Sequence, residues 1–496
     1  MDSLRLKNYR CFDDTGKVNL KPLTFLLGKN SSGKSSFLKF FPLLKQSVGI
    51  KRNGVFLWLS NDVDFKDFKN TVKNGEGDIE IEFEINDFEA GTSYNQKTTL
   101  EVSFVISSKG NNLDVLKSMT FKFAGQTIYI WSENDNYLNM TKAKIQVNNL
   151  EFTTTKEDTY LYNTTGLLPR LFFASQTDDE VSVYSSLWCE KQLDDQLGGR
   201  AKLGIRSYEK IYRTVFLGNV NDTTSFLQKH LKKLNIEDVD WKYINDLYLY
   251  YHTNNIIDAV NENLVKLSSR TSYIRPLRAT AERYYRFQNY AVDEIDSDGK
   301  NLGMYLYNLS KGDFEKFQKW TDDIFRFKLS LKPSEGHVEM LIEEENKPPR
   351  NMVDIGFGYT QILPTIAIIW KSLYMDFPSI HRKYRVDKNE HLVVIEQPEL
   401  HLHPAMQGKF AKMLAKIIMD SSIHYRDLRI IIETHSETIL NKIGEMIEIG
   451  ELDKEKVNVV LFNASEEEGK YIKSASFTKD GYLTDWPLGF LSDNVY

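Results

Sequence analysis

The sequence predicts an α/β fold built on a nucleotide-binding core, with an antiparallel β subdomain and an inserted helical lobe. Three observations support this prediction. A glycine-rich loop stands between an apolar strand and a helical pattern within 23–47. Residues of about 78–155 alternate between apolar and polar with a period of two, which is typical of antiparallel strands. From about 340 onward, short apolar strands alternate with helical segments, which indicates a parallel sheet.

The bulk composition fits a cytoplasmic globular protein with more than one domain. The chain has 496 residues, a net charge of −6 and two cysteines, Cys11 and Cys189. So few cysteines fit a reducing compartment, and the negative net charge gives the surface as a whole no attraction for nucleic acid. The start of the sequence lacks the apolar core of a signal peptide. The apolar run 362–370 is too short to cross a bilayer, so we expect no membrane span.

The same patterns divide the chain into four parts. We expect an N-terminal nucleotide-binding lobe over 1–77, an antiparallel β subdomain over 78–170, a helical insert over 171–272 and a C-terminal lobe over 273–496. The first and last parts together form the nucleotide-binding domain, which the two middle parts interrupt. No linker rich in proline and glycine marks the boundaries.

The stretch GKNSSGKS, from Gly28 to Ser35, matches the phosphate-loop pattern G-x-x-x-x-G-K-[ST] and has the required strand before it and helix after it. In such loops backbone N–H groups surround a phosphate, the lysine contacts the β- and γ-phosphates, and the following hydroxyl binds Mg²⁺. We therefore expect a nucleoside triphosphate with Mg²⁺ here. The expected contact residues are Gly28, Asn30, Ser31, Ser32, Gly33, Lys34, Ser35 and Ser36.

Two further apolar strands end in polar residues. VVIEQPE places Glu396 where its carboxylate is expected to hold Mg²⁺ together with Ser35. RIIIETHSE places His435 at a strand tip, where it is a candidate for sensing the γ-phosphate or positioning water; the alternative is an ordinary helix-start residue. Gln397 occupies the position at which such ATPases usually carry a second acid, and an amide holds water without accepting its proton. Glu399 either supplies that missing base or faces a dimer partner.

A second glycine motif, VDIGFGYTQILPTI, spans 353–366. Its glycines free the backbone, and Thr360 is expected to cap a helix whose first turn includes Pro364. That arrangement makes a second anion-binding helix start. One chain seldom points two such ends at one phosphate, whereas two copies around one nucleotide use both; the alternative is a tight turn before a core helix. The residues expected to contact the nucleotide of a second copy are Gly356, Gly358, Thr360 and Gln361.

Together these residues resemble the ABC-type ATPase heads of SMC, Rad50 and OLD-family proteins, and most closely a bacterial branch of AAA-family ATPases with a C-terminal domain of unknown function. GKNSSGKSS looks like its Walker A motif, DIGFGYTQILP its signature loop, VVIEQPELHLHP its Walker B motif and ETHSE its switch histidine. The resemblance implies ATP and Mg²⁺ as ligands, a homodimer or higher homo-oligomer, and an approach of Arg10 to the nucleotide. No glutamine is recognisable as that of a Q-loop.

Three functions stay open. Relatives in bacterial anti-phage systems imply a slow ATPase that acts as sensor or scaffold for a separately encoded effector such as a nuclease. The alternatives are a DNA-maintenance ATPase that clamps nucleic acid on ATP binding, and a nucleotide-gated binding protein with negligible turnover. The sequence shows no sustained heptads, so we expect no Rad50-like arm. No Asp-x-Asp pair follows His435, so we expect no built-in nuclease.

Basic residues leave a contact with DNA open as an alternative to an ordinary charged surface. The basic stretches are 200–213 and 228–234. Arg278 and Arg283 are expected to be solvated residues of a helix, with a phosphate or nucleic-acid contact as the alternative.

His401 and His403 flank a leucine, a spacing that can bind zinc. No cysteine or further histidine lies near them in the sequence, so a loop that contacts a dimer partner is the preferred interpretation.

Overall fold

The computed structural model describes residues 1–90, 97–108, 113–137, 140–152, 157–177, 180–184, 192–193, 195–196, 210–230, 240–278, 282–286, 292–375, 389–423, 426–465 and 469–484. The chain forms two compact units, each assembled from segments that are distant in sequence. Unit 1 comprises Met1–Val18 and Leu43–Ser269, and unit 2 comprises Asn19–Pro42 and Arg270–Tyr496. The predicted α/β class with a large antiparallel part is confirmed.

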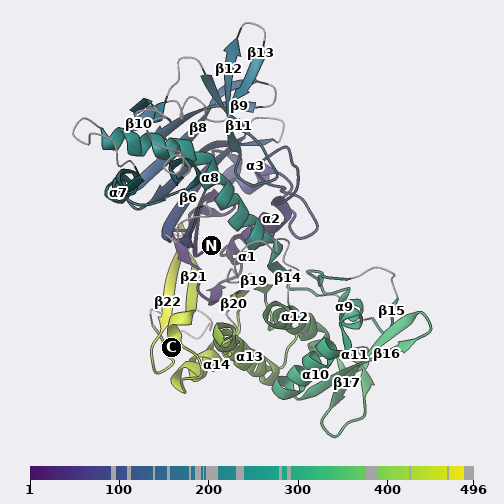
Figure 1. The fold of residues 1–496 in the computed structure, drawn as a ribbon. Helices are drawn as coiled ribbons and strands as arrows, with labels where there is room; N and C mark the ends of the chain where they lie inside the picture. Colours follow the sequence, from purple (N-terminus) through teal and green to yellow (C-terminus); the bar gives the residue numbers. More distant parts are fainter. Residues whose placement is uncertain are drawn as a thin grey trace. The chain divides into compact units, whose positions relative to one another are not determined.

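One large sheet organises unit 1 (Figure 1). Its strands follow the order β13-β12-β11-β9-β8-β7-β6-β5-β1-β2, with β10 beside β9 and β3 beside β1. In β5 burial alternates from residue to residue, because one face of the strand packs on the core and the other meets water. The described strands are β1 (Ser3–Tyr9), β2 (Phe12–Asp14), β3 (Val18–Asn19), β5 (Ile79–Phe88), β6 (Thr98–Ser108), β7 (Asp114–Phe123), β8 (Gln126–Tyr137), β9 (Met140–Val147), β10 (Leu150–Phe152), β11 (Glu157–Tyr162), β12 (Arg170–Thr177) and β13 (Glu180–Tyr184).

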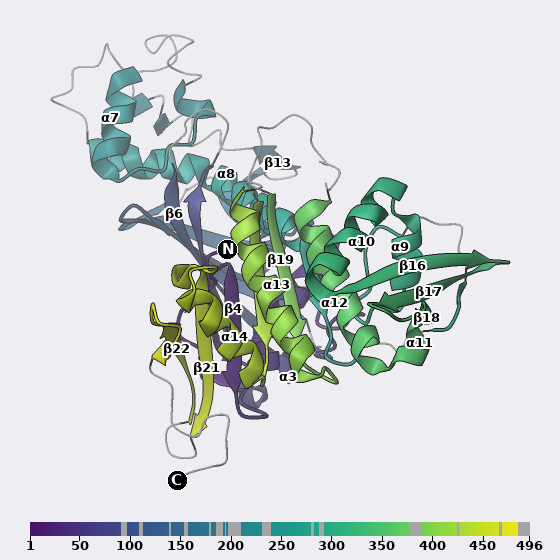
Figure 2. The ribbon, with the colours of Figure 1, turned by 90° about the horizontal axis from the view of Figure 1, so that it is seen from below.

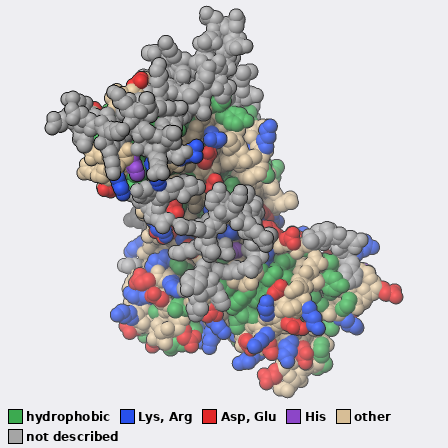
Figure 3. Space-filling view, in the orientation of Figure 1, with side chains coloured by type: hydrophobic (Ala, Val, Ile, Leu, Met, Phe, Trp, Pro, Cys, Tyr) green, Lys and Arg blue, Asp and Glu red, His purple; other side chains and the backbone are tan. Residues whose placement is uncertain are grey.

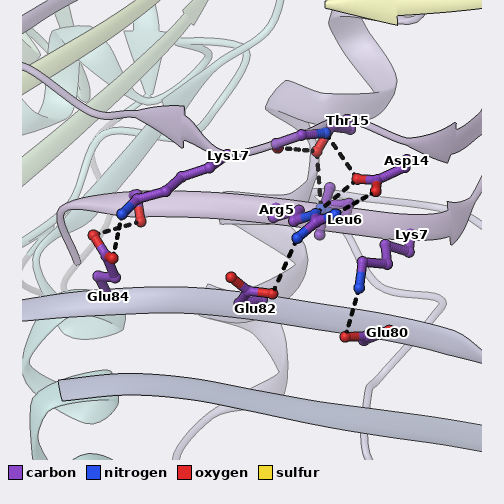
Figure 4. A network of polar contacts seen from close by, with 11 residues as sticks. Arg5, Leu6, Lys7, Asp14, Thr15, Lys17, Glu80, Glu82 and Glu84 are labelled. Carbon is purple, nitrogen blue, oxygen red and sulfur yellow. Dashed lines mark hydrogen bonds and ion pairs between the residues drawn. The ribbon is translucent and has the colours of Figure 1, made fainter. Parts of the chain in front are cut away.

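Charged pairs join β1 to its neighbours on the polar face of this sheet (Figure 4). Arg5 contacts Asp14 at 2.6 Å and Glu82 at 3.6 Å, and Lys7 contacts Glu80 at 2.9 Å. Partly exposed pairs of this kind contribute roughly 0–1 kcal/mol each. They therefore add little to the stability of the sheet.

A long helix, α8 (Trp241–Ser269), packs on this sheet in unit 1. Asn261 anchors it, because its side-chain amide donates to the carbonyl of Leu168 at 2.8 Å and accepts from the N–H of the same residue at 2.9 Å. His252 is fully buried in the same helix, with Nε2 3.1 Å from the carbonyl oxygen of Ile211. Further helical segments include α2 (Phe40–Ser47), α3 (Phe68–Thr71), the 3-10 helix η1 (Lys73–Gly75) and α7 (Val220–His230).

Two boundary expectations differ from the structure. The expected lobe 1–77 is divided, since Met1–Val18 belongs to unit 1 and only Asn19–Pro42 belongs to unit 2. The reason is strand pairing: β1 lies antiparallel to β5, with Leu4 opposite Phe83. In addition, β12 and β13 lie at the start of the range expected to be helical.

Unit 2 is built on a second sheet, with the order β14-β19-β20-β4-β21-β22-β23. The strands from β14 to β21 are parallel, and each residue of β4 is buried, as a strand covered on both faces requires. Figure 2 shows α13 and α14 over one face of this sheet. The strands are β14 (Thr271–Ile274), β19 (Asn389–Glu396), β20 (Arg426–Glu433), β4 (Leu23–Gly28), β21 (Val457–Ser465), β22 (Gly469–Phe477) and β23 (Leu483–Thr484).

The rest of unit 2 consists of helices and a small antiparallel sheet that share one apolar core with the parallel strands. The helices are α1 (Lys34–Leu38), α9 (Leu302–Asn308), α10 (Lys311–Phe325), α11 (Met352–Ile355), α12 (Phe357–Tyr374), α13 (Pro404–Ile423), α14 (Glu437–Glu448) and the 3-10 helix η3 (Lys454–Lys456). The small sheet contains β15 (Tyr285–Arg286), β16 (Phe327–Ser334), β17 (His337–Glu344) and β18 (Arg350–Asn351). None of the helices seen in the described ranges has the length and apolar character needed to traverse a bilayer.

The parallel pairing brings three strand ends together. Glu396 at the end of β19 is the register partner of Glu433 at the end of β20. Glu433 in turn pairs with Leu26, two residues before Gly28 at the end of β4. Carboxyl ends of parallel strands are the usual edge for ligands in open α/β sheets, so this edge is where the candidate site is built.

Candidate nucleotide-binding site

The phosphate loop leaves β4 at Gly28 and enters α1 at Lys34. A Cβ at Gly28 would lie 2.3 Å from the carbonyl oxygen of Phe462 on β21, so only glycine fits there. Gly33 has φ of 106° and Ser31 has φ of 64°, both left-handed. The loop therefore turns sharply, with Asn30 and Ser31 exposed at its tip.

Lys34 lies inside this loop. Its ammonium donates to the carbonyl oxygens of Gly28 at 2.8 Å and Lys29 at 2.9 Å. Burial lowers its pKa, and the charges of Glu433 and Glu399 oppose that shift. The hydroxyl oxygen of Ser32 is also buried, and no hydrogen-bond partner for it exists in the described part of the chain.

Two buried carboxylates stand at the neighbouring strand ends. Both carboxylate oxygens of Glu433 lie within hydrogen-bond distance of the Ser35 hydroxyl, at 2.9 and 2.7 Å. Burial raises the pKa of Glu433 to about 7; the Ser35 hydrogen bond lowers it, and the charge of Glu396 raises it further. Glu396 accepts a hydrogen bond from the Tyr273 hydroxyl at 2.6 Å, and burial raises its pKa as well.

The sequence predicted Glu396 as the carboxylate that holds Mg²⁺ together with Ser35, and Glu433 was not predicted. The available signal was the repetition of one design: VVIE and IIIE are both apolar strands that end in a glutamate. Adjacent parallel strands place such ends side by side, and the structure pairs the two residues in register.

Glu399 and His435 are joined in unit 2. The Glu399 carboxylate accepts from the Thr434 hydroxyl at 2.8 Å and from the backbone N–H of His435 at 2.7 Å. Burial raises the pKa of Glu399, while these hydrogen bonds lower it. Burial and the nearby Lys34 lower the pKa of His435, which favours a neutral ring. Its Nε2 is buried, and among the residues with described positions it finds no partner.

Gln397 forms the turn after β19. Its backbone has a left-handed φ of 43°, and its N–H donates to the carbonyl oxygen of Glu433 at 2.8 Å. The residue is half-buried. This backbone bond holds residue 397 beside Glu433, the last residue of β20. Glu433 stands two residues before His435 in the sequence.

Arg278 corrects one expectation. It was expected in a solvated helix, yet it lies outside any helix and is only 5% exposed. Its Nη2 donates to the carbonyl oxygen of Glu396 at 3.2 Å, whereas Nε and Nη1 have no hydrogen-bond partner within the described ranges. Burial lowers its pKa to about 10, against the charges of Glu399 and Glu396. Arg283 is also outside a helix; it is half-exposed and pairs with Asp354.

The second glycine motif differs in detail from its expected form. Gly356, with φ of 108°, is the N-cap of α12, and the helix begins at Phe357 rather than after Thr360. The Thr360 hydroxyl donates to the carbonyl of Phe357 inside the helix, and both Thr360 and Gln361 are buried within their own unit. Gly356 has a non-helical backbone, so the helix starts after it, and Pro364, expected in the first turn, lies inside the helix instead. At the start of α12, Gly356 and Phe357 are exposed, Phe357 by 61%, and Gly358 is half-buried.

The remaining candidates are the two histidines after β19, Arg10 and the basic stretches. His401 is exposed, with its ring 6.1 Å from that of Phe357, and Nδ1 of His403 accepts from the N–H of Ala405 at 3.2 Å. The described residues contain no group of three His, Cys, Asp or Glu side chains placed to hold a metal ion. Arg10, in unit 1, places its guanidinium over the ring of Phe65. Most of the basic stretch 200–213 and the end of 228–234 lie outside the described residues.

The groups at the strand ends fit a nucleotide with a divalent cation. Buried donors without partners in the described chain, at Arg278 and Ser32, match the acceptor oxygens of a polyphosphate. Hydroxyl and carboxylate oxygens at Ser35 and Glu433 are the hard ligands that Mg²⁺ prefers.

Comparison with known proteins gives one family match and one curated relative. The sequence profile of the family described as AAA ATPase domain matches residues 1–440. Endonuclease GajA of Bacillus cereus (strain HuB5-5) is 26% identical over 191 residues, which are 38% of this chain and 22% of that protein. The aligned region thus spans under a quarter of the length of this relative.

Solved structures with a detectable likeness include Smc head domains. The head from Pyrococcus furiosus, bound to the C-terminal domain of ScpA, shares 11% identity with a TM-score of 0.32, and 96% of each chain is covered. The head with a coiled coil and joint from Pyrococcus yayanosii shares 9% identity with a TM-score of 0.35, and 97% of each chain is covered.

Proposed function

This chain belongs to the AAA ATPase domain family, and we propose that it binds ATP with Mg²⁺ on its phosphate loop and hydrolyses the ATP slowly. The proposal is carried by one observation: the loop containing Lys34, the two strand-end carboxylates and the buried donor groups of Arg278 all meet at one edge of the parallel sheet. That edge supplies positive groups for phosphates and oxygen ligands for a cation.

Each group has a distinct role in this proposal. Lys34 offsets the charge of the β- and γ-phosphates, and Ser35 binds the cation, which when present neutralises phosphate charge. The neutral His435 ring, with its free Nε2, contacts the terminal phosphate or holds the attacking water. The Nε and Nη1 atoms of Arg278 have no hydrogen-bond partner in the described part of the chain. Their N–H groups donate to the negative charge that develops on the phosphate oxygens in the transition state.

Slow turnover follows from the groups at residues 397 and 399. The Gln397 amide can orient water but cannot take its proton. The Glu399 carboxylate is already bonded to Thr434 and to the backbone of His435. General-base assistance is typically worth roughly 10²–10⁴-fold, so a site without it turns over slowly.

Dimerisation is part of the proposal. The N-terminus of α12, which spans 18 residues, begins at the exposed Phe357, and the first backbone N–H groups of a helix have no partner within that helix. A helix start of this length attracts anions. We propose that the segment Gly356 to Gly358 contacts the nucleotide of a second copy, and that Thr360 and Gln361 support it from the core of their own chain.

The cellular role is proposed as that of a sensor or scaffold in bacterial defence against phage, with a separately encoded effector such as a nuclease. Its support is the resemblance of the motifs, together with the partial match to a protein named an endonuclease. That match also motivates the second candidate, an ATPase that clamps DNA. On the face of unit 2 seen in Figure 3, however, Lys/Arg and Asp/Glu side chains are interspersed, which does not favour a phosphate backbone.

The direct test is ATP binding and phosphate release by the purified chain and by Lys34→Ala. Wild-type protein should bind ATP and release phosphate slowly, while Lys34→Ala should lose binding because the ammonium at the phosphates is gone. The matched control is Lys29→Ala, an exposed lysine of the same loop, which should bind normally. Undiminished affinity in Lys34→Ala would refute the phosphate-loop assignment. Affinity purification of the tagged chain during phage infection tests the effector.

A further inference from the structure

The phosphate-loop hydroxyl has two acidic neighbours, and the structure distinguishes between them. Ser35 is within hydrogen-bond distance of both Glu433 oxygens, at 2.9 and 2.7 Å. Glu396, the acid at the end of the usual metal-holding strand, instead has one oxygen 2.6 Å from the Tyr273 hydroxyl. Both acids are 3% exposed, so burial alone does not separate them.

The spacing between Ser35 and Glu433 matches what a small cation needs. An octahedral Mg²⁺ has ligand oxygens about 2.0–2.1 Å away, and two oxygens on neighbouring corners then lie about 2.9 Å apart. The Ser35 hydroxyl and a Glu433 oxygen already have this separation. A cation can therefore take the place of the shared hydrogen with little movement of either side chain.

The charges around Glu433 also favour replacing the hydrogen shared with Ser35 by a cation. Glu433 and Glu396 are buried register partners on adjacent strands, so their negative charges repel each other. A divalent cation beside Glu433 would offset the negative charges of both carboxylates, Glu433 and Glu396.

We propose that Glu433, rather than Glu396, is the carboxylate that binds the divalent cation of the nucleotide together with Ser35. Glu396 then acts as a positioning residue: its carboxylate is held by Tyr273, and its carbonyl oxygen accepts from Arg278. This inference rests on the proposed binding of ATP at the loop, and it names the cation ligand within that site.

The test measures ATP affinity with Mg²⁺ and with EDTA, for wild type, Glu433→Gln and Glu396→Gln. Glutamine at 433 can still accept from Ser35, so the loop keeps its hydrogen bond while the charge is lost. We expect Glu433→Gln to bind ATP in EDTA at least as well as wild type, because a negative charge near the phosphates is gone. Its Mg²⁺-dependent gain in affinity should fall by roughly tenfold or more.

Glu396→Gln should keep most of the Mg²⁺-dependent gain, and the exposed Glu437→Gln serves as the matched surface control. Ser35→Ala should reproduce the loss seen in Glu433→Gln, which provides a second route if one variant folds poorly. Electron paramagnetic resonance of Mn²⁺ added to the protein–ATP complex measures binding of the cation directly.

Several outcomes would overturn the inference. These are a Mg²⁺-dependent gain that survives in Glu433→Gln, a loss in Glu396→Gln as large as that in Glu433→Gln, or a wild-type protein that binds ATP equally well with and without Mg²⁺. Failure of wild-type protein to bind ATP under either condition would instead refute the proposed function.

Discussion

The carboxylate of Glu399 accepts a hydrogen bond from the backbone N–H of His435 at 2.7 Å. The other carboxylate oxygen of Glu399 accepts from the Thr434 hydroxyl. Both oxygens are therefore bonded to the loop that carries His435 in the same unit. A side chain held in this way is better placed to orient the histidine than to accept a proton from water or to meet a second copy of the chain.

Gln397→Glu should speed hydrolysis. The backbone N–H of residue 397 is bonded to the carbonyl of Glu433, so the substitution changes mainly the end of a half-buried side chain. A carboxylate there can accept the proton of the attacking water. The single-turnover rate, measured by rapid quench, should rise about tenfold or more. An unchanged rate, combined with near-total loss in Glu399→Gln, would identify Glu399 as the base.

Glu399→Gln should slow hydrolysis through His435. The amide NH₂ would face one of two donors, and a mismatched buried hydrogen bond costs roughly 1–3 kcal/mol. Rates of Glu399→Gln, His435→Ala and the double variant form a thermodynamic cycle. We expect the double variant to be little slower than His435→Ala alone. Fully additive losses would show that Glu399 acts independently of the histidine.

Arg278→Lys should weaken ATP binding more than ADP binding. Lysine keeps the charge but lacks the two sets of N–H donors that Nε and Nη1 offer. The ratio of ATP to ADP affinity should fall by about tenfold, the size of one good charged contact. Arg283→Lys, at a half-exposed arginine, is the control. Equal weakening for both nucleotides would place Arg278 away from the terminal phosphate.

Mixing two inactive variants tests the composite site. A Cβ at Gly358 would meet its nearest atom at 3.7 Å, so Gly358→Asp adds charge without a clash. In mixed dimers of Lys34→Ala and Gly358→Asp, one site loses both motifs and the other keeps both. Partial recovery of ATPase activity is expected. Complete inactivity at every mixing ratio would argue against the arrangement, unless both sites must act together.

Stability should fall in mild acid because of His252. Burial lowers its pKa from the ordinary 6.5 to about 4. Between these two pH values His252 is therefore mostly protonated in the unfolded chain and mostly neutral in the folded chain. The stabilisation is complete above pH 6.5 and is lost toward pH 4. Between pH 7.5 and 5.5 this group should cost about 1.3 kcal/mol of unfolding free energy.

Urea unfolding at the two pH values measures this cost in wild type and in His252→Asn, which should lose that share of the pH dependence. His403→Asn, at an exposed histidine, should retain it. Equal pH dependence in all three proteins would contradict the assignment to His252.

The sequence was most informative where the signal is local. The uninterrupted apolar run LTFLLG predicted a buried strand before the phosphate loop, and β4 has those bounds. Alternation over 78–155 predicted antiparallel strands because solvent and core faces alternate along each of them. The resemblance to AAA-family ATPases, made on short motifs, is confirmed by the match over residues 1–440.

The misses depend on contacts between distant segments. The repeated strand-end glutamate hinted at Glu433, but its contact with Ser35, 398 residues away, and its register with Glu396 come from the fold. Arg278 looked solvated because its stretch is polar, yet it is buried and its guanidinium donates to Glu396, 118 residues later. Thr360 was expected as the cap from residue preference, whereas the backbone of Gly356 starts the helix.

The insertion of β4 between β20 and β21 has a consequence for how the protein is made. The phosphate loop leaves the ribosome before both strands that flank β4, which are encoded about 400 residues later. At roughly 5–20 residues per second, translation needs on the order of 20–80 s to supply them. During that interval the nascent chain lacks a completed nucleotide site, and the apolar β4 has no neighbours. Chaperone binding to the emerging β4 segment would protect it until β20 and β21 arrive.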